Sequence, residues 1–160
     1  MKQKSLIDYL DENLDQIDFD GALEWKWNKK NRSFILGMEF YIENNSNREI
    51  IDSNDMKSVE PIIDFYDEIL LFDKTKEIKF NKDDFLVCLP FNGKKGWTKG
   101  EADAFLDVLQ DTLDNGESDL MDFINDEKIE TFNLNWNMDE FKKQLEKNND
   151  DNEILPYPKF

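Results

Sequence analysis

Apolar side chains recur at every second position over nine residues in the first third of the chain, and this pattern constrains the fold more than any other. The apolar positions are Phe34, Leu36, Met38, Phe40 and Ile42. Successive side chains of a β-strand point to opposite faces of the sheet, so this spacing predicts a long strand with one buried face. The same period occurs just before the polar turn 28–31, at Leu23, Trp25 and Trp27. Together the two segments predict a β-hairpin.

Helices are expected where capping residues precede apolar residues at helical spacing. Ser5 followed by Asp8 predicts an N-terminal helix that ends at about Gln16. Asn137 followed by Glu140 predicts the cap of a final helix in the same way.

A pair of helices is expected between these two. Thr98 with Glu101 forms a capping-box signature, and the amphipathic helix that follows is expected to end at about Leu113. The dipeptide Asn115-Gly116 predicts the stop, with Gly116 at the C′ position. A second short helix is then expected over residues 118–124.

Further strands are expected over residues 48–52, 69–72 and 85–91. Pro90 predicts that its strand ends there or lies at a sheet edge, because proline cannot donate to the ladder. The alternation of Phe132, Leu134 and Trp136 predicts a last strand.

Two segments are less regular. Residues 53–57 predict a loop, and residues 58–67 fit either a short helix interrupted at Pro61 or an extended segment. Strands grouped apart from helices are typical of α+β proteins. We therefore predict a single α+β domain over residues 1–160. It would have a mainly antiparallel sheet of about five to six strands, an N-terminal helix, a helix pair after the central strands and a C-terminal helix.

The composition excludes several functions. The 160 residues include 37 Asp or Glu and 20 Lys or Arg, which gives a net charge of -17, and there is no histidine and one cysteine, Cys88. Histidine-based acid–base catalysis and zinc sites built from His and Cys are therefore impossible within this chain. We predict no catalytic residue, no metal site and no cofactor. The question of enzyme activity stays open, leaning toward no, because carboxylates and lysines can still do chemistry.

The acidic residues concentrate in one stretch, since residues 101–127 include ten Asp or Glu and no Lys or Arg. At about 100° per residue, four of them fall on one helix face: Asp103, Asp107, Asp111 and Asp114. One interpretation is a solvated face that keeps the protein soluble. The functional interpretations are a docking face for a basic protein, and a nucleic-acid mimic that inhibits a DNA- or RNA-binding protein. Direct binding to nucleic acid is not expected from a chain of this charge.

A loop with glycines and lysines, residues 92–100, precedes the central helix. Such a loop at a helix N-terminus can hold an anion through backbone N–H groups and the helix dipole. Lys94, Lys95 and Gly96 are the candidate anion-binding residues, either in a binding site or in an enzyme. The alternative interpretation is a turn whose lysines face the acidic helix.

The ends of the chain indicate its compartment. No apolar segment follows the first basic residues, and no apolar run approaches the roughly 20 residues that span a bilayer. We expect a cytoplasmic protein with no membrane contact, in which Cys88 is buried as a thiol. The polar residues 148–153 are predicted to be mobile, whereas the apolar ending 154–160 is expected to pack on the domain. The sequence does not distinguish a monomer from a homodimer.

Three segments carry a resemblance to a known family. They are residues 27–31, residues 83–91 followed by Lys94-Lys95-Gly96, and residues 116–123. In these segments and in its Pro-Tyr-Pro ending, the chain resembles an uncharacterised family of small acidic proteins from lactic-acid bacteria, the domain of unknown function 3013 family. The resemblance covers nearly the full chain. It implies a single-domain bacterial cytoplasmic protein and supplies no activity, ligand or catalytic residue.

Overall fold

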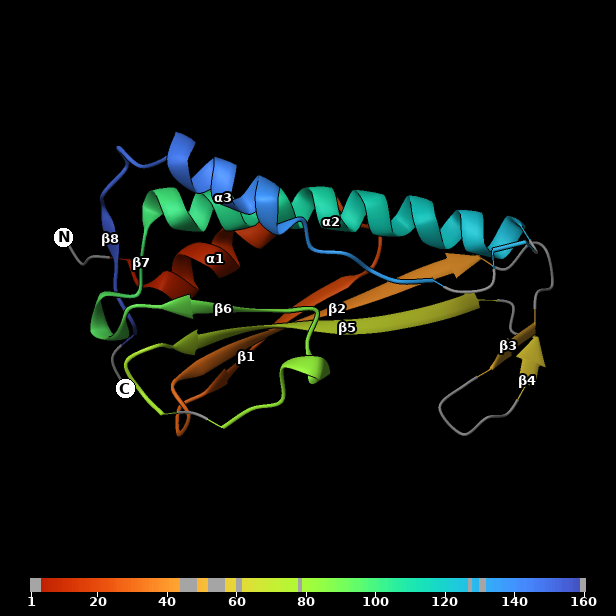
Figure 1. The fold of residues 1–160 in the computed structure, drawn as a ribbon, viewed down its shortest axis with the longest axis horizontal. Helices are drawn as coiled ribbons and strands as arrows, with labels where there is room; N and C mark the ends of the chain where they lie inside the picture. Colours follow the sequence, from red (N-terminus) through yellow and green to blue (C-terminus); the bar gives the residue numbers. More distant parts are fainter. Residues whose placement is uncertain are drawn as a thin grey trace.

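A four-stranded sheet carries the helices on one of its faces (Figure 1). The structure is a computed structural model that describes residues 4–43, 49–51, 57–59, 62–77, 79–126, 128–129 and 132–158. The sheet order is β1-β2-β5-β6, with strands β1 (Ala22–Asn28), β2 (Ser33–Glu43), β5 (Ile62–Asp73) and β6 (Val87–Phe91). The α+β class, the mainly antiparallel sheet and the N- and C-terminal helices are confirmed.

The predicted hairpin is formed by β1 and β2, which pair antiparallel with Trp25 opposite Leu36. The alternating side chains of β2 point toward the helices, and four of them are fully buried: Phe34, Leu36, Met38 and Phe40. β2 also pairs along its whole length with β5, which makes it a central strand. The hydrophobic period therefore predicted both the strand and its buried face.

The described residues of the segment 58–67, which fitted either a helix or an extended segment, are extended. Its first part belongs to β4 (Lys57–Val59), which pairs with β3 (Glu49–Ile51) in a separate short sheet, and its second part opens β5. The loop expected at 53–57 lies mostly outside the described residues. Because short strands pair separately, the main sheet has four strands where five to six were expected. β6 pairs parallel to β5 at the sheet edge, as Pro90 predicted.

The predicted helix pair is one continuous helix, α2 (Lys99–Asn125), of 27 residues. The capping box of Thr98 and Glu101 is confirmed at its start. Gly116 does not end the helix, because this glycine serves a close approach: a Cβ there would lie 2.6 Å from Leu134 Cδ1 and 2.9 Å from Phe40 Cε2. The stop prediction is wrong because two side chains pack directly on the helix backbone at this position.

The last predicted strand is also absent from the described part of the chain, since Phe132, Leu134 and Trp136 lie in an irregular segment. Their burial does alternate with exposed neighbours, because one side of the segment packs on α2 and on the core. Period-two alternation reports a single buried side, and here no strand lies alongside to form a ladder.

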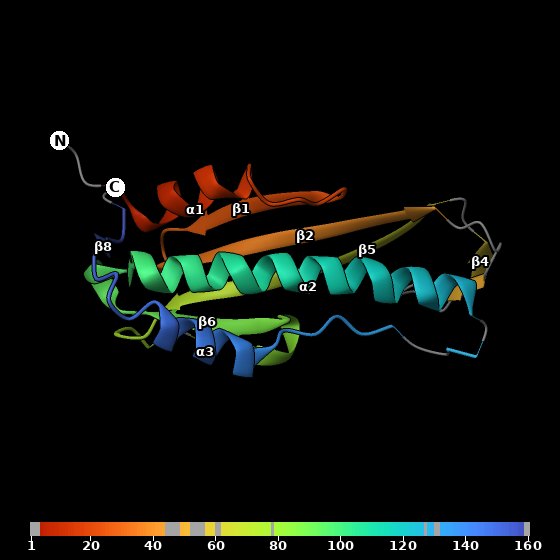
Figure 2. The same cartoon turned by 90° about the horizontal axis from the view of Figure 1, so that it is seen from above.

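Two shorter helices flank α2, with α1 on one side and α3 on the other (Figure 2). α1 (Leu6–Leu14) begins at the predicted cap Ser5, whose hydroxyl accepts the N–H of Asp8 at 3.2 Å. α3 (Met138–Lys147) begins after the predicted cap Asn137. Both caps were predicted correctly because they are read from local sequence.

The apolar ending packs on the domain, as expected. β8 (Ile154–Leu155) pairs with β7 (Trp97–Thr98), and Tyr157 is 7% exposed. The segment 148–153, predicted to be mobile, is tied to the start of α2: the N–H groups of Lys99 and Gly100 donate to carbonyls of that segment at 2.7 and 3.1 Å. Its mobility stays a prediction.

Cys88 is half-buried on the outer face of β6 and not fully buried as expected. The outer face is only partly covered, since the helices lie on the other face (Figure 1). Burial nevertheless raises the pKa of the Cys88 thiol, so the group stays protonated at neutral pH.

Candidate functional site

The four predicted face residues lie along α2, and the structure divides them into two groups. Asp103 is half-buried where α1 contacts the helix, whereas Asp107, Asp111 and Asp114 are exposed. The accessible acidic surface, which we call the acidic face (Asp107, Asp111, Asp114), therefore begins one turn later than the sequence predicts.

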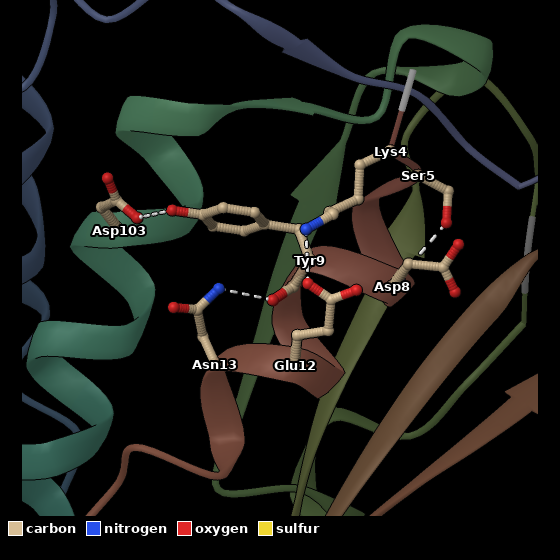
Figure 3. Close-up of polar contacts among 7 residues, drawn as sticks. All are labelled: Lys4, Ser5, Asp8, Tyr9, Glu12, Asn13 and Asp103. Carbon is tan, nitrogen blue, oxygen red and sulfur yellow. Dashed lines mark hydrogen bonds and ion pairs between the residues drawn. The ribbon is translucent and has the colours of Figure 1, made fainter. Parts of the chain in front are cut away.

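Asp103 holds the two helices together. The Tyr9 hydroxyl of α1 donates to Asp103 Oδ1 at 2.5 Å (Figure 3). Burial, this hydrogen bond and the nearby negative charges of Asp103, Asp151 and Glu153 raise the pKa of Tyr9 far above its ordinary value. The phenol therefore remains a hydrogen-bond donor, and Asp103 is occupied as its acceptor.

The carboxylates of the acidic face make few polar contacts with the rest of the protein. The carboxylates of Asp107 and Asp111 have no hydrogen bond or ion pair with any residue that the structure describes. Asp114 accepts a hydrogen bond from Gln110 Nε2 at 3.0 Å. Partial desolvation, followed by repulsion from Asp103 and Asp111, raises the pKa of Asp107, and Lys147 on α3 opposes the shift. Like charges are thus held together here, and neither Asp107 nor Asp111 forms an ion pair with a described residue.

The end of α2 adds to this negative field. Its last turn has no basic residue, although cations are the side chains that stabilise a helix C-terminus. Asp119 and Asp122 are exposed in the final two turns and carry further negative charge. The helix dipole and the side chains therefore have the same sign at this end.

One flank of α2 is closed by the connection between α1 and β1. Gln110 Oε1 accepts the N–H of Asp18 at 2.8 Å, and Gln110 Nε2 donates to the Asp18 carbonyl at 2.9 Å. Two turns further on, Glu117 accepts the N–H of Asp20 at 3.4 Å. These contacts leave the top of the helix and the flank on the α3 side as the accessible surfaces.

The lysine loop lies at the opposite end of the molecule from the end of α2 (Figure 1). Lys94 and Lys95 are exposed in the short 3-10 helix η2 (Gly93–Lys95), and Gly96 closes the turn at φ 62°. The helix N–H donors nearby are taken, because those of Lys99, Gly100 and Glu101 donate within the protein. The N-terminus of α2 therefore offers none of these three N–H groups to an anion at this loop.

A small pocket lies beside the second half of α2, against the irregular segment that leads into α3. Its volume is about 330 Å³, and it is lined by Thr112, Asn115, Gly116, Asp119, Asn135 and Asn137. Thr112 and Gly116 are buried and form its floor, and the other four residues are exposed around it. The pocket borders the acidic face on the flank that α1 leaves open.

The sequence did not indicate that these residues form a pocket, although Asn115, Gly116 and Asn137 were assigned to helix ends. The lining comes from two separate segments, residues 112–119 and 135–137, and asparagines carry no distinctive spacing. Their juxtaposition depends on Gly116, which lets the segment around Leu134 approach the helix. Reading that glycine as a helix stop concealed the contact.

Two further properties of the described residues bear on function. No group of three or more His, Cys, Asp or Glu side chains among them is arranged to hold a metal ion. No helix in the described ranges is both long and apolar enough to cross a membrane.

Comparisons with known proteins place the chain among proteins without an assigned role. A family model described as "Protein of unknown function (DUF3013)" matches residues 1–159. The chain is also similar to a solved structure described as "Crystal Structure of Conserved Protein of Unknown Function from Enterococcus faecalis". The two are 31% identical over 99% of this chain and 98% of that chain, with a TM-score of 0.88. No curated protein matches.

Proposed function

The chain belongs to the family described as protein of unknown function (DUF3013), which supplies no activity, and we propose that it is a non-enzymatic module that binds a basic protein through its acidic face. The observation that carries the proposal is the state of Asp107 and Asp111. Both carboxylates are exposed, and neither is paired within the described residues.

Electrostatics supports this use of the surface. Like charges four residues apart destabilise a helix by about 0.2–0.5 kcal/mol per pair, and acidic residues near a helix C-terminus oppose the dipole. A solvated surface does not require this arrangement, because acids and bases can alternate. A basic partner would relieve the repulsion on binding and would be attracted from a distance.

The proposal also places the protein in the bacterial cytoplasm. With one cysteine in the chain, no internal disulfide can form, which fits a reducing compartment. The oligomeric state is left open.

The test is affinity capture from native bacterial lysate with three forms of the full chain. The face variant carries Asp107→Asn, Asp111→Asn and Asp114→Asn. The control variant carries Asp11→Asn, Asp84→Asn and Glu146→Gln, three exposed acids away from the face, so that both variants change net charge equally. Wild type and control should capture the same basic protein, and the face variant should lose it.

Salt and competitors sharpen the result. Attraction between exposed charges is screened above about 0.15 M salt, so capture should fall steeply as salt rises. Competition by duplex DNA would identify the partner as a nucleic-acid-binding protein and the module as its inhibitor. Equal capture by the face variant and wild type would contradict the proposal.

A further inference from the structure

The pocket beside α2 has an unusual balance of hydrogen-bonding groups. The Thr112 hydroxyl already donates to the Val108 carbonyl at 2.7 Å, so it can only accept from a ligand. Asp119 offers its carboxylate oxygens as acceptors, and neither its side chain nor that of Asn115 has a partner among the described residues. Asn135 Nδ2 donates to the Asn133 carbonyl at 3.4 Å, which leaves its Oδ1 available.

The donors of the lining are the two N–H groups of Asn115, the remaining N–H of Asn135 and the two N–H groups of Asn137, whose Oδ1 accepts the N–H of Glu140 at 3.0 Å as the cap of α3. Against these five N–H groups stand about eight lone pairs on the oxygens of Asp119, Asn115 and Asn135, together with the Thr112 oxygen, so acceptor sites outnumber donors. Such a lining favours a ligand that donates several hydrogen bonds and accepts few.

The charge of the lining restricts the class of ligand further. Asp119 is the ionisable residue of the lining, and no Lys or Arg lines the pocket. An anion would meet this carboxylate and the neighbouring acidic face, and a neutral amide would leave the carboxylate without a counter-charge. A cation with several N–H groups satisfies both the charge and the acceptors.

Between the two common cationic side chains, the shape of the pocket favours arginine. A guanidinium group presents five N–H donors in one plane, whereas an ammonium group is a compact point charge with three donors. The acceptors here come from two segments, Asn115 and Asp119 from α2 and Asn135 from the irregular segment beside it. A planar group with five donors can bond to acceptors of both segments at once.

We propose that this pocket binds the guanidinium group of an arginine side chain on the basic partner, with Asp119 as its counter-ion and the asparagine carbonyl oxygens as further acceptors. The inference rests on the proposed function, because the pocket borders the acidic face and would receive a residue of the same partner. The face would supply general attraction, and the pocket would select one side chain.

The first test uses small ligands and the full chain. N-acetyl-arginine N-methylamide is titrated while the side-chain amide signals of Asn115 and Asn135 are followed by NMR, and the corresponding lysine and citrulline derivatives are titrated in parallel. Citrulline keeps the shape of arginine without its charge. The arginine derivative should shift these signals with saturation, and the citrulline derivative should bind at least about tenfold more weakly because it lacks the charge-assisted bond.

Two variants locate the effect. Asp119→Asn keeps the shape of the side chain and should weaken binding of the arginine derivative by about tenfold. Asp122→Asn changes an exposed acid on the same helix that does not line the pocket, so its affinity should stay within about twofold of wild type. Equal binding of arginine and citrulline derivatives, or no effect of Asp119→Asn, would overturn the proposal.

Capture of the partner separates this inference from the proposed function. If the face variant loses the partner while Asp119→Asn retains it fully, the pocket proposal fails and the function stands. If the arginine derivative binds at the pocket while the face variant still captures every protein that wild type captures, the proposed function fails. Loss of the partner with Asp119→Asn, together with its displacement by the arginine derivative, supports both and identifies a partner arginine as the source of the guanidinium.

Discussion

The two halves of α2 are continuous in sequence but have opposite surroundings. The first half lies between α1 and α3, and its opening N–H groups are bonded to the C-terminal segment (Figure 2). The second half packs its inner side on the sheet and the segment around Leu134, while its outer side stays open. Acidic residues occur in both halves, so composition alone does not separate them.

The difference shows how one residue type serves two purposes. In the first half, Asp103 is half-buried and accepts the Tyr9 hydroxyl, so it joins two helices. In the second half, Asp119 and Asp122 have no such partner among the described residues. Acids of α2 that contact another element, such as Asp103, should therefore respond to mutation through stability, and the exposed acids of either half mainly through binding.

The largest loss of stability is expected where Tyr157 anchors the C-terminal segment on the core. Its ring lies against Phe34 and Phe91, with centroids 5.5 and 5.7 Å apart, and its hydroxyl accepts Trp27 Nε1 at 2.7 Å. Tyr157→Ala should lower the free energy of unfolding by about 3–5 kcal/mol, as for other buried aromatic residues. Urea denaturation measures the loss.

The control for this prediction is Tyr157→Phe, which keeps the ring and removes only the hydroxyl. It should cost about 1 kcal/mol, the net value of one hydrogen bond. Similar losses in both variants would mean that the ring contacts do not anchor the ending.

A somewhat smaller loss of stability is expected when a buried ion pair is broken. Arg32 Nε lies 2.8 Å from Asp73 Oδ2, and the Asp73 side chain is 1% exposed. Burial acts to raise the pKa of Asp73, but hydrogen bonds from Thr75 and Arg32 outweigh it and hold the pKa below its ordinary value. Arg32→Met should cost about 3 kcal/mol, because it leaves a buried carboxylate without its counter-ion.

The sign of the pH effect checks this origin. A carboxyl group with a lowered pKa contributes stability at neutral pH that is lost as the pH falls through its value in the folded state. Arg32→Met should therefore lose less stability than wild type on acidification below about pH 4, where Asp carboxylates take up protons. An unchanged pH profile of unfolding in Arg32→Met would contradict this account.

An intermediate loss of stability is expected in the second half of α2, when Gly116 is replaced by alanine. Alanine is the better helix former by about 1 kcal/mol, yet its Cβ would lie within 3 Å of Leu134 and Phe40. Overpacking of this kind costs about 1–3 kcal/mol, so Gly116→Ala should destabilise the protein or at best leave it unchanged. Ser118→Ala, at an exposed position of the same helix, should be neutral or stabilising in the same thermal unfolding experiment.

A second mutation tests the cause. Leu134→Ala added to Gly116→Ala should cost less than the sum of the two single changes, because it removes the side chain that the new methyl group meets. Strict additivity would show that the close approach is not the reason for the glycine. Loss of arginine binding in Gly116→Ala would also tie the approach to the pocket.

These positions show which parts of the structure could be predicted from the sequence. The hairpin and the three helix caps follow from local spacing, since alternation and capping pairs lie within a few residues. Gly116 was misread because its role depends on Phe40 and Leu134, which are distant in the chain. The ion pair of Arg32 and Asp73 joins residues 41 apart, and no local sequence pattern predicts it.

The candidate site divides in the same way. Helical spacing placed Asp107, Asp111 and Asp114 on one accessible face of α2, because it depends only on the helix itself. The same spacing could not show that Tyr9 from α1 occupies Asp103, nor that an irregular segment forms a pocket with Asn115. Both depend on which neighbour packs against which flank.

The smallest expected effect tests the strain within the acidic face. Partial desolvation and repulsion from its neighbours raise the pKa of Asp107, so the folded protein takes up a proton there more readily than the unfolded chain does. Lowering the pH from neutral toward the ordinary value of an Asp carboxyl group should therefore add stability, and Asp107→Asn should reduce this gain. Urea denaturation of wild type and Asp107→Asn at a series of pH values from about 7 to 4.5 measures the difference between their slopes of stability against pH.

Salt separates the two causes of the raised pKa. Because about 1 M salt shortens the screening length to about 3 Å, it should remove the gain in stability that comes from repulsion and leave the gain that comes from desolvation. A gain that is the same in Asp107→Asn and wild type would mean that the face is not strained, and the electrostatic argument for a basic partner would lose its support.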